Sequence, residues 1–169
     1  MYIDVSNVSI SFEENKEQHT ILNDVSLQVE KGEFICLLGP SGCGKSTLLN
    51  AMAGFLKPSS GEIKIDGQTV EKPSMKYVTI FQNYGLLPWR SVQKNVELGL
   101  ETKKLGREEK KKITDHYLEM VGLKEAAKKR PAQLSGGMQQ RVAIARALAV
   151  EPESCLWMSR SGHWMRSPE

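Results

Sequence analysis

Glycines, a lysine and hydroxyl residues are closely spaced in the segment that reads Gly-Pro-Ser-Gly-Cys-Gly-Lys-Ser-Thr. Glycines let a backbone curl until consecutive N–H groups point inward at phosphate oxygens. Lys45 adds a compact positive charge for terminal phosphates, and the hydroxyl of Ser46 suits Mg²⁺. The pattern therefore predicts a loop that binds a nucleoside triphosphate with magnesium. Its predicted binding residues are Gly39, Pro40, Ser41, Gly42, Cys43, Gly44, Lys45, Ser46 and Thr47.

The flanking residues predict the elements that position this loop. Phe34 to Leu38 is a short apolar run, typical of a strand covered on both faces. Lys45 to Ala53 predicts a helix, closed by Gly54, whose N-terminus adds partial positive charge to the loop. Two interpretations of Cys43 stay open, a small filler and a redox-sensitive thiol.

A second glycine-bearing segment, Leu-Ser-Gly-Gly-Met-Gln-Gln-Arg from Leu134 to Arg141, is called the signature segment below. Ser135 is a good N-cap for a helix whose first residues are glycines. A backbone without side chains can approach an anion closely, with N–H groups and the helix dipole aimed at it. The residues predicted to contact nucleotide here are Ser135, Gly136, Gly137 and Gln139.

Together the two segments resemble the ATP-binding-cassette (ABC) superfamily, and the resemblance extends from Met1 to Glu153. It implies that ATP and Mg²⁺ are the ligands. It also implies a homodimer, because in this family the signature segment closes over the nucleotide held by a second ATP-binding subunit.

Two further positions match the family. Gln82 takes the place of the glutamine loop, whose amide contacts Mg²⁺ and the attacking water, and we assign no catalytic residue to this chain. Phe12 lies where the family has an aromatic residue under the adenine. A core or turn aromatic is the open alternative for Phe12.

The segment from Asn83 to Val96 resembles the nitrate, sulfonate and taurine branch of bacterial importers. The resemblance implies membrane permease subunits as partners, a periplasmic or extracellular solute-binding protein, and a cytoplasmic location on the inner face of the membrane. Leu86, Leu87 and Trp89 have two open interpretations, as core of a helical subdomain or as part of the groove for the permease.

Composition agrees with one cytoplasmic domain. Net charge is +3, which is too mild to indicate nucleic-acid binding, and three cysteines form no metal-type spacing. Alternating apolar residues predict strands in the first third of the chain, and helical spacing follows. We expect an α/β P-loop cassette over residues 1–153, with an antiparallel β-subdomain, a helical subdomain at about 83–134, and the final core strands missing.

Residues 154–169 depart from the family, which continues with an apolar strand ending in Asp-Glu-Pro. The last aspartate is Asp115, and Glu169 is the one acid after Glu153. Trp157-Met158 and Trp164-Met165 have single codons, and each pair forces an aspartate when read from the third base. These aspartates lie seven apart, as in the family, so we interpret the tail as a shifted reading frame.

This departure leaves the activity open. The leading hypothesis is the ATPase subunit of a bacterial importer, with this chain deficient in hydrolysis. The alternative is a non-hydrolysing nucleotide-binding remnant. Chromosome and DNA-repair ATPases insert a long coiled coil between the two motifs, but no heptads occur here. The signature segment argues against a nucleotide kinase.

Overall fold

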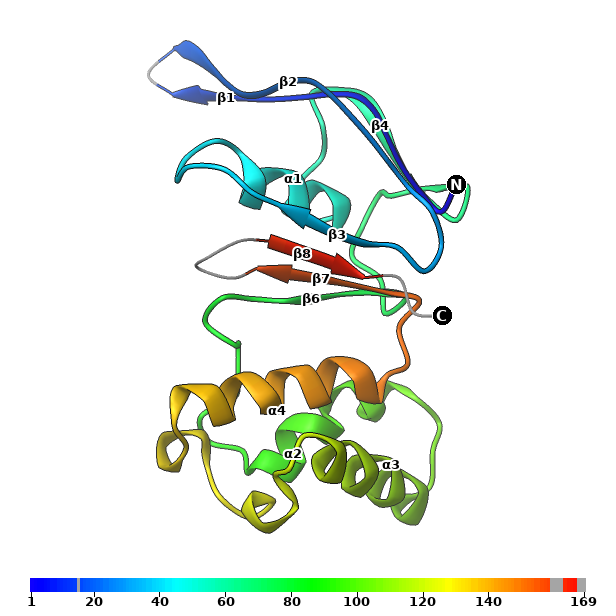
Figure 1. The fold of residues 1–169 in the computed structure, drawn as a ribbon, viewed down its shortest axis with the longest axis vertical. Coiled ribbons are helices and arrows are strands. Elements are labelled where there is room, and N and C mark those ends of the chain that lie inside the picture. The colour runs from blue at the N-terminus through cyan, green and yellow to red at the C-terminus, as the bar shows by residue number, and fades with distance from the viewer. Residues whose placement is uncertain (15, 159–162, 167–169) are drawn as a thin grey trace. The chain divides into compact units, whose positions relative to one another are not determined.

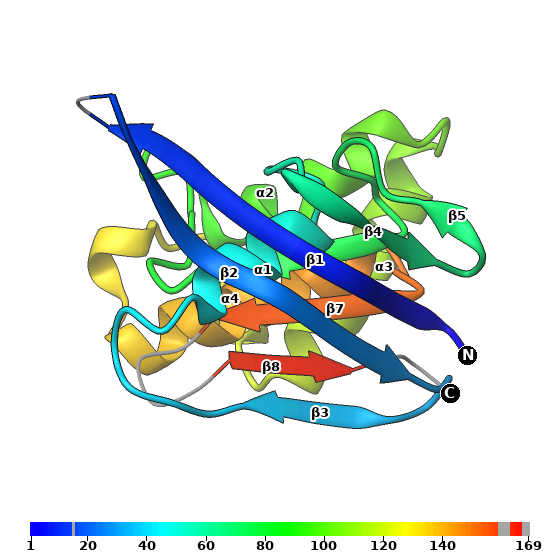
Figure 2. The same ribbon diagram turned by 90° about the horizontal axis from the view of Figure 1, so that it is seen from above.

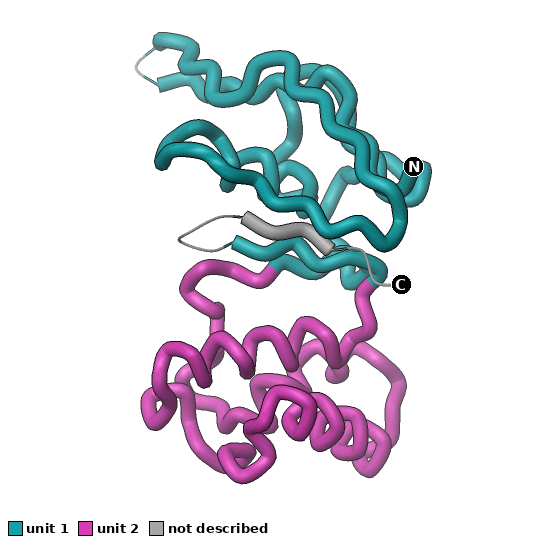
Figure 3. The backbone as a smooth tube through the Cα atoms, viewed as in Figure 1, with its two compact units in different colours: residues 1–79, 153–169 teal, residues 80–152 magenta. Residues whose placement is uncertain are grey.

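The computed structural model describes residues 1–14, 16–158 and 163–166. Its chain divides into two units (Figure 3). The first comprises Met1–Thr79 with Glu153–Glu169, and the second comprises Ile80–Pro152. Among the described residues, no helix combines the length and apolar character needed to cross a bilayer.

An antiparallel sheet forms one layer of the first unit (Figure 1). Buried and more exposed residues alternate along β1 on either side of a register shift between Val5 and Val8, and Ile3, Val5, Val8 and Ile10 are buried. The strands, in spatial order, are β2 (Glu17–Val29), β1 (Ile3–Glu14), β4 (Ser60–Ile65) and β5 (Gln68–Thr69).

A second sheet and one helix complete this unit. The strands, in spatial order, are β3 (Phe34–Leu37), β8 (His163–Arg166), β7 (Ser154–Met158) and β6 (Tyr77–Ile80). Helix α1 (Lys45–Met52) lies between the two sheets (Figures 1 and 2). One apolar core includes residues from the first sheet, from α1 and from β7. The loop that precedes α1 is therefore anchored on both sides by packed elements.

The C-terminal residues differ from one expectation. The sequence predicted that the final core strands are missing, which would leave the edge of β3 unpaired, but β8 pairs with β3 from Phe34↔Arg166 to Leu37↔His163. β7 and β8 also pair with each other, from Cys155↔Arg166 to Met158↔His163. Pairing satisfies N–H and C=O groups that an open edge would expose. The rest of the predicted tail, residues 159–162 and 167–169, lies outside the described residues.

The second unit is helical and has its own apolar core, which includes Val92, Val96, Leu118, Val142 and Ala145. The α-helices that supply these side chains are α2 (Val92–Glu97), α3 (Arg107–Met120) and α4 (Gly136–Ala149). Short 3-10 helices connect them: η1 (Leu98–Thr102), η2 (Lys124–Ala126) and η3 (Pro131–Gln133).

Candidate functional site

The glycine-rich loop joins the end of β3 to the start of α1. Gly42 and Gly44 have φ angles of 85° and 91°, in a region that side chains disfavour. The N–H of Cys43 donates to the carbonyl of Pro40 at 3.4 Å. Residues 39–43 are exposed, as is Ser46, whereas Thr47 is half-buried. The segment thus has the strand–loop–helix context that its sequence predicted.

The side chain of Lys45 folds back over this loop. Its Nζ donates to the carbonyl oxygens of Gly39 at 2.8 Å and Pro40 at 2.6 Å, and it lies 3.4 Å from Sγ of Cys43. The ammonium group is therefore held against the loop backbone and does not extend into solvent. A fixed positive charge at an exposed glycine-rich turn suits a phosphate group.

The N-terminus of α1 adds to the positive potential. Gly44 is the N-cap, no side chain caps the helix, and its first turn, which the structure describes in full, contains no acidic residue. The partial positive charge of the helix end is thus left for an external anion. A Cβ on Gly44 would lie 2.5 Å from Cδ2 of Leu22 and 3.2 Å from the carbonyl oxygen of Ile21. Only glycine lets the loop pack this closely on β2.

Phe12 lies on β1 beyond the last buried residue. Along the strand it follows Val8 and Ile10 at every second position, so the three share a face. Ile10 pairs with Leu22, the residue that packs against Gly44. Phe12 is 44% exposed, which argues against the core interpretation. The strand therefore presents an exposed aromatic ring close in register to the residue that supports the loop.

The signature segment leads into α4 in the second unit. Oγ of Ser135 accepts from the N–H of Met138 at 3.3 Å, which is the predicted cap. A Cβ on Gly137 would meet nothing within 4 Å, so the backbone there is open to a large ligand. Nε2 of Gln139 donates to the carbonyls of Pro131 at 3.1 Å and Leu134 at 3.3 Å. The side chain of Gln139 thus fixes the main chain that leads into α4.

Gln82 lies in the same unit as the signature segment, in a turn that directly follows β6. The N–H of Tyr84 donates to the carbonyl of Phe81 at 2.9 Å, and we call residues 81–85 the glutamine turn. Nη1 and Nη2 of Arg146 donate to the carbonyls of Gly85 and Tyr84 at 2.7 and 2.8 Å. Burial lowers the pKa of Arg146. Sequence reasoning missed Arg146, because a polar residue within a regular helix gives no signal of a partner more than sixty residues away.

The residues beyond the glutamine turn separate into two groups. Leu86 packs against the core of the helical unit. Trp89 is 68% exposed. The core interpretation therefore fits Leu86, whereas Trp89 is left on the surface.

Strand β7 has no side-chain carboxylate. Its sequence is Ser-Cys-Leu-Trp-Met, and Ser154, Leu156 and Met158 are the buried residues. Cys155, between them, has its pKa raised from 9.0 to about 11 by burial. Since the thiolate is the nucleophile, this shift lowers its population at pH 8 by about 100-fold.

We therefore expect iodoacetamide at pH 8 to alkylate the exposed Cys43 well before Cys155 in the folded protein. Peptide mass spectrometry over a time course measures both rates. Cys155 should react readily once urea unfolds the chain. Equal rates at Cys43 and Cys155 without urea would contradict a packed β7.

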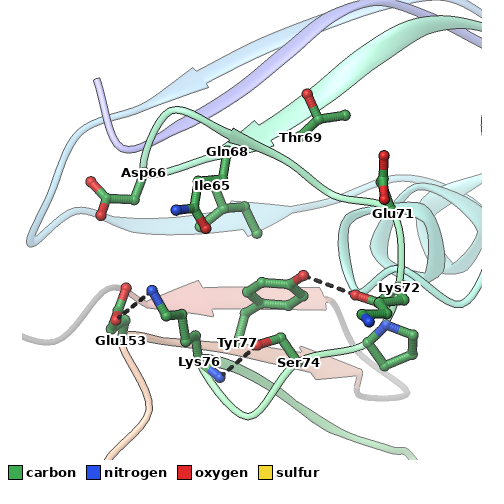
Figure 4. Close-up of a pocket in the computed structure, with 11 residues that line it drawn as sticks. Ile65, Asp66, Gln68, Thr69, Glu71, Lys72, Ser74, Lys76, Tyr77 and Glu153 are labelled. Atoms are coloured by element: carbon green, nitrogen blue, oxygen red, sulfur yellow. Dashed lines mark hydrogen bonds and ion pairs between the residues drawn. The ribbon is translucent and has the colours of Figure 1, made fainter.

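A separate cavity of about 270 Å³ lies in the first unit, beside the turn between β4 and β5 (Figure 4). Nζ of Lys76 lies 3.5 Å from the carboxylate of Glu153, and the hydroxyl of Tyr77 donates to the carbonyl of Lys72 at 2.9 Å. None of the predicted nucleotide contacts lines this cavity. Of the two lysines that line the cavity, Lys76 pairs with the carboxylate of Glu153, so part of its positive charge is neutralised.

A strand, a glycine-rich loop and a helix that begins with lysine define a P-loop nucleotide-binding α/β protein. Residues 22–157 match the family model described as ABC transporter. The chain therefore belongs to the ABC transporter family.

Several relatives are ATP-binding proteins of import systems. The chain is 49% identical over 148 residues to the nitrate import ATP-binding protein NrtD of Synechococcus elongatus, covering 86% of this chain and 54% of NrtD. It is 47% identical to the bicarbonate transport ATP-binding protein CmpD of that organism, covering 90% and 55%. It is 49% identical to the taurine import ATP-binding protein TauB of Pseudomonas aeruginosa, covering 88% and 57%. The chain thus spans little more than half of each relative.

Solved structures agree on the fold. The dimeric ATP-binding cassette MJ0796, bound to ADP and Pi after hydrolysis, matches with a TM-score of 0.84 and 36% identity, over 92% of this chain and 72% of that one. The cassette cbiO1 of Clostridium perfringens, part of the transporter complex cbiONQ, matches with a TM-score of 0.80 and 29% identity, over 92% and 64%. These similarities confirm the predicted fold class.

Proposed function

We propose that this chain is the ATP-binding subunit of an importer of the nitrate, sulfonate and taurine type. The supporting observation is the loop at Gly39, where Lys45 is held against the backbone and the end of α1 carries no acidic residue. The triphosphate of ATP binds the loop, and Ser46 and Gln82 contact its magnesium ion. Phe12 stacks under the adenine, where such stacking contributes about 1–3 kcal/mol.

A second copy of the chain is the first partner in this proposal. Ser135, Gly136 and Gly137 of each copy close over the nucleotide of the other, where the open backbone at Gly137 gives a phosphate room. Permease subunits bind the exposed surface at Trp89 and hold the dimer on the inner face of the membrane. A periplasmic or extracellular solute-binding protein supplies the solute.

Within this proposal, the chain binds Mg-ATP without hydrolysing it. The family has a strand that ends in Asp-Glu after the signature helix; the strand that follows α4 here, β7, carries no side-chain carboxylate, which supports this part of the proposal. The same observation supports the second candidate, a nucleotide-binding remnant without transport activity. Reconstitution with permease subunits separates the two candidate functions. Only a transport subunit would exchange its bound nucleotide more slowly when solute is present.

Nucleotide binding is tested by thermal unfolding. Mg-ATP at about 100 times its Kd should stabilise the chain by about 2.7 kcal/mol, which raises Tm by roughly 5–10 °C for a chain of this size. Lys45→Ala should lose most of this shift, because a charge-assisted contact contributes about 1.5–3 kcal/mol.

Lys57→Ala is the matched control, since Lys57 is an exposed lysine of the same unit outside the loop. It should keep the full Mg-ATP shift. If the unsubstituted chain showed no change in Tm with Mg-ATP, the proposed function would be wrong.

A further inference from the structure

The glutamine turn has an unusual backbone for its sequence. Tyr84 and Gly85 both have positive φ angles, 62° and 54°. A tyrosine in this region is disfavoured and persists only where its surroundings hold it. The N–H of Gly85 also donates to the carbonyl of Asn83 at 2.8 Å. The turn is therefore tight, and the carbonyls of Tyr84 and Gly85 both accept hydrogen bonds from one donor group on α4.

That group is the guanidinium of Arg146. Among the described residues, the acceptors found for it are these two main-chain carbonyls, at 2.7 and 2.8 Å, rather than a carboxylate. A half-buried cation without a carboxylate partner is costly unless its hydrogen bonds are good. The planar fork of arginine matches two adjacent acceptors, whereas lysine offers a single point charge. The two hydrogen bonds of Arg146 thus stabilise the backbone conformation of the glutamine turn.

The glutamine turn also reaches the other end of α4. A Cβ on Gly136 would lie 3.9 Å from the hydroxyl oxygen of Tyr84. The hydroxyl of Tyr84 therefore lies near the first residue of the helix, and its carbonyl accepts from Arg146. Gln82 lies two residues before Tyr84 in the same turn. The two hydrogen bonds of Arg146 therefore link the glutamine turn to the helix that begins with the signature glycines.

We propose that Arg146 is a positioning residue that makes Gln82 and the signature segment respond as one body. This inference rests on the proposed function, in which Gln82 contacts the nucleotide of its own chain and Ser135 to Gly137 contact that of the partner. Occupancy of one site then orients the glycines that complete the other. Loss of the fork leaves both parts present but uncoordinated.

The experiment measures two equilibria for the full chain with Mg-ATP. Binding of a fluorescent ATP analogue reports the loop, and analytical ultracentrifugation reports nucleotide-driven dimerisation. Arg146→Lys, which keeps the charge, should weaken dimerisation about tenfold and change analogue binding less than twofold. Arg146→Met should do the same or more. Lys103→Met is the matched control, because Lys103 donates to the carbonyl of Val150, the C-cap of the same helix, and does not contact the glutamine turn in the hydrogen bonds of the described residues. It should leave dimerisation unchanged.

A double-mutant cycle distinguishes the positioning role of Arg146 from a purely structural role. If Arg146 acts through Gln82, then Arg146→Lys should add little to the loss that Gln82→Ala causes alone. Additive losses, or unchanged dimerisation in Arg146→Lys, would overturn the positioning role while nucleotide binding stands. If the unsubstituted chain binds no Mg-ATP, the proposed function fails and the positioning role fails with it.

Discussion

With saturating Mg-ATP, the purified chain should release no phosphate beyond the amount seen with Lys45→Ala. Phosphoryl transfer depends on positioning and on charge, and a residue must orient and polarise the attacking water. A positioned general base contributes about 10²- to 10⁴-fold to such a rate. Strand β7, which the proposed function takes as the counterpart of the family's acidic strand, reads Ser-Cys-Leu-Trp-Met and supplies no carboxylate. A phosphate-release assay with a coupled fluorescent sensor measures the rate.

The result is informative only if binding is intact in the same sample. Mg-ATP should still raise Tm, so that a silent assay reports missing chemistry and not a collapsed site. Lys45→Ala sets the background, since it removes the proposed phosphate contact. Phosphate release that disappears in Lys45→Ala would show that another group polarises the water.

Local chemistry made the two nucleotide-facing motifs predictable. The sequence predicted a helix from Lys45 to Ala53, and α1 spans Lys45–Met52. It also predicted Ser135 as the cap of the next glycine-bearing helix, and Oγ accepts from Met138. Glycines, caps and helix starts act within a few residues, so their effects can be derived from short segments.

Contacts between distant residues could not be derived in this way. Arg146 binds carbonyls 61 and 62 positions before it, and nothing in its own helix marks that choice. Strand β7 was missed because Ser154–Met158 were assigned to a polar tail, although Leu156 is fully buried in the core of the first unit. Its buried residues do alternate, as in a half-buried strand. That alternation was the available signal, but five residues are too few to establish it.

Among the substitutions considered in the helical unit, Asn95→Ala should cause the largest loss in the free energy of unfolding. It is fully buried, and its Oδ1 accepts from the N–H of Leu87 at 2.8 Å. Its Nδ2 lies 3.0–3.2 Å from the carbonyls of Leu87, Arg90 and Ser91. One side chain therefore satisfies the backbone of the loop that carries Trp89. Asn95→Ala leaves several buried groups unpaired and should cost about 3 kcal/mol or more.

Urea unfolding followed by far-ultraviolet circular dichroism measures this loss. Gln93→Ala is the control on the same helix, because its amide donates to one side chain, Glu97, at 2.9 Å. It should cost less than about 1 kcal/mol. Since the loop between the glutamine turn and α2 depends on Asn95, the variant should also expose Trp89 further to a fluorescence quencher. A cost for Asn95→Ala no greater than that for Gln93→Ala would mean that water replaces these bonds and that the loop does not need the buried amide.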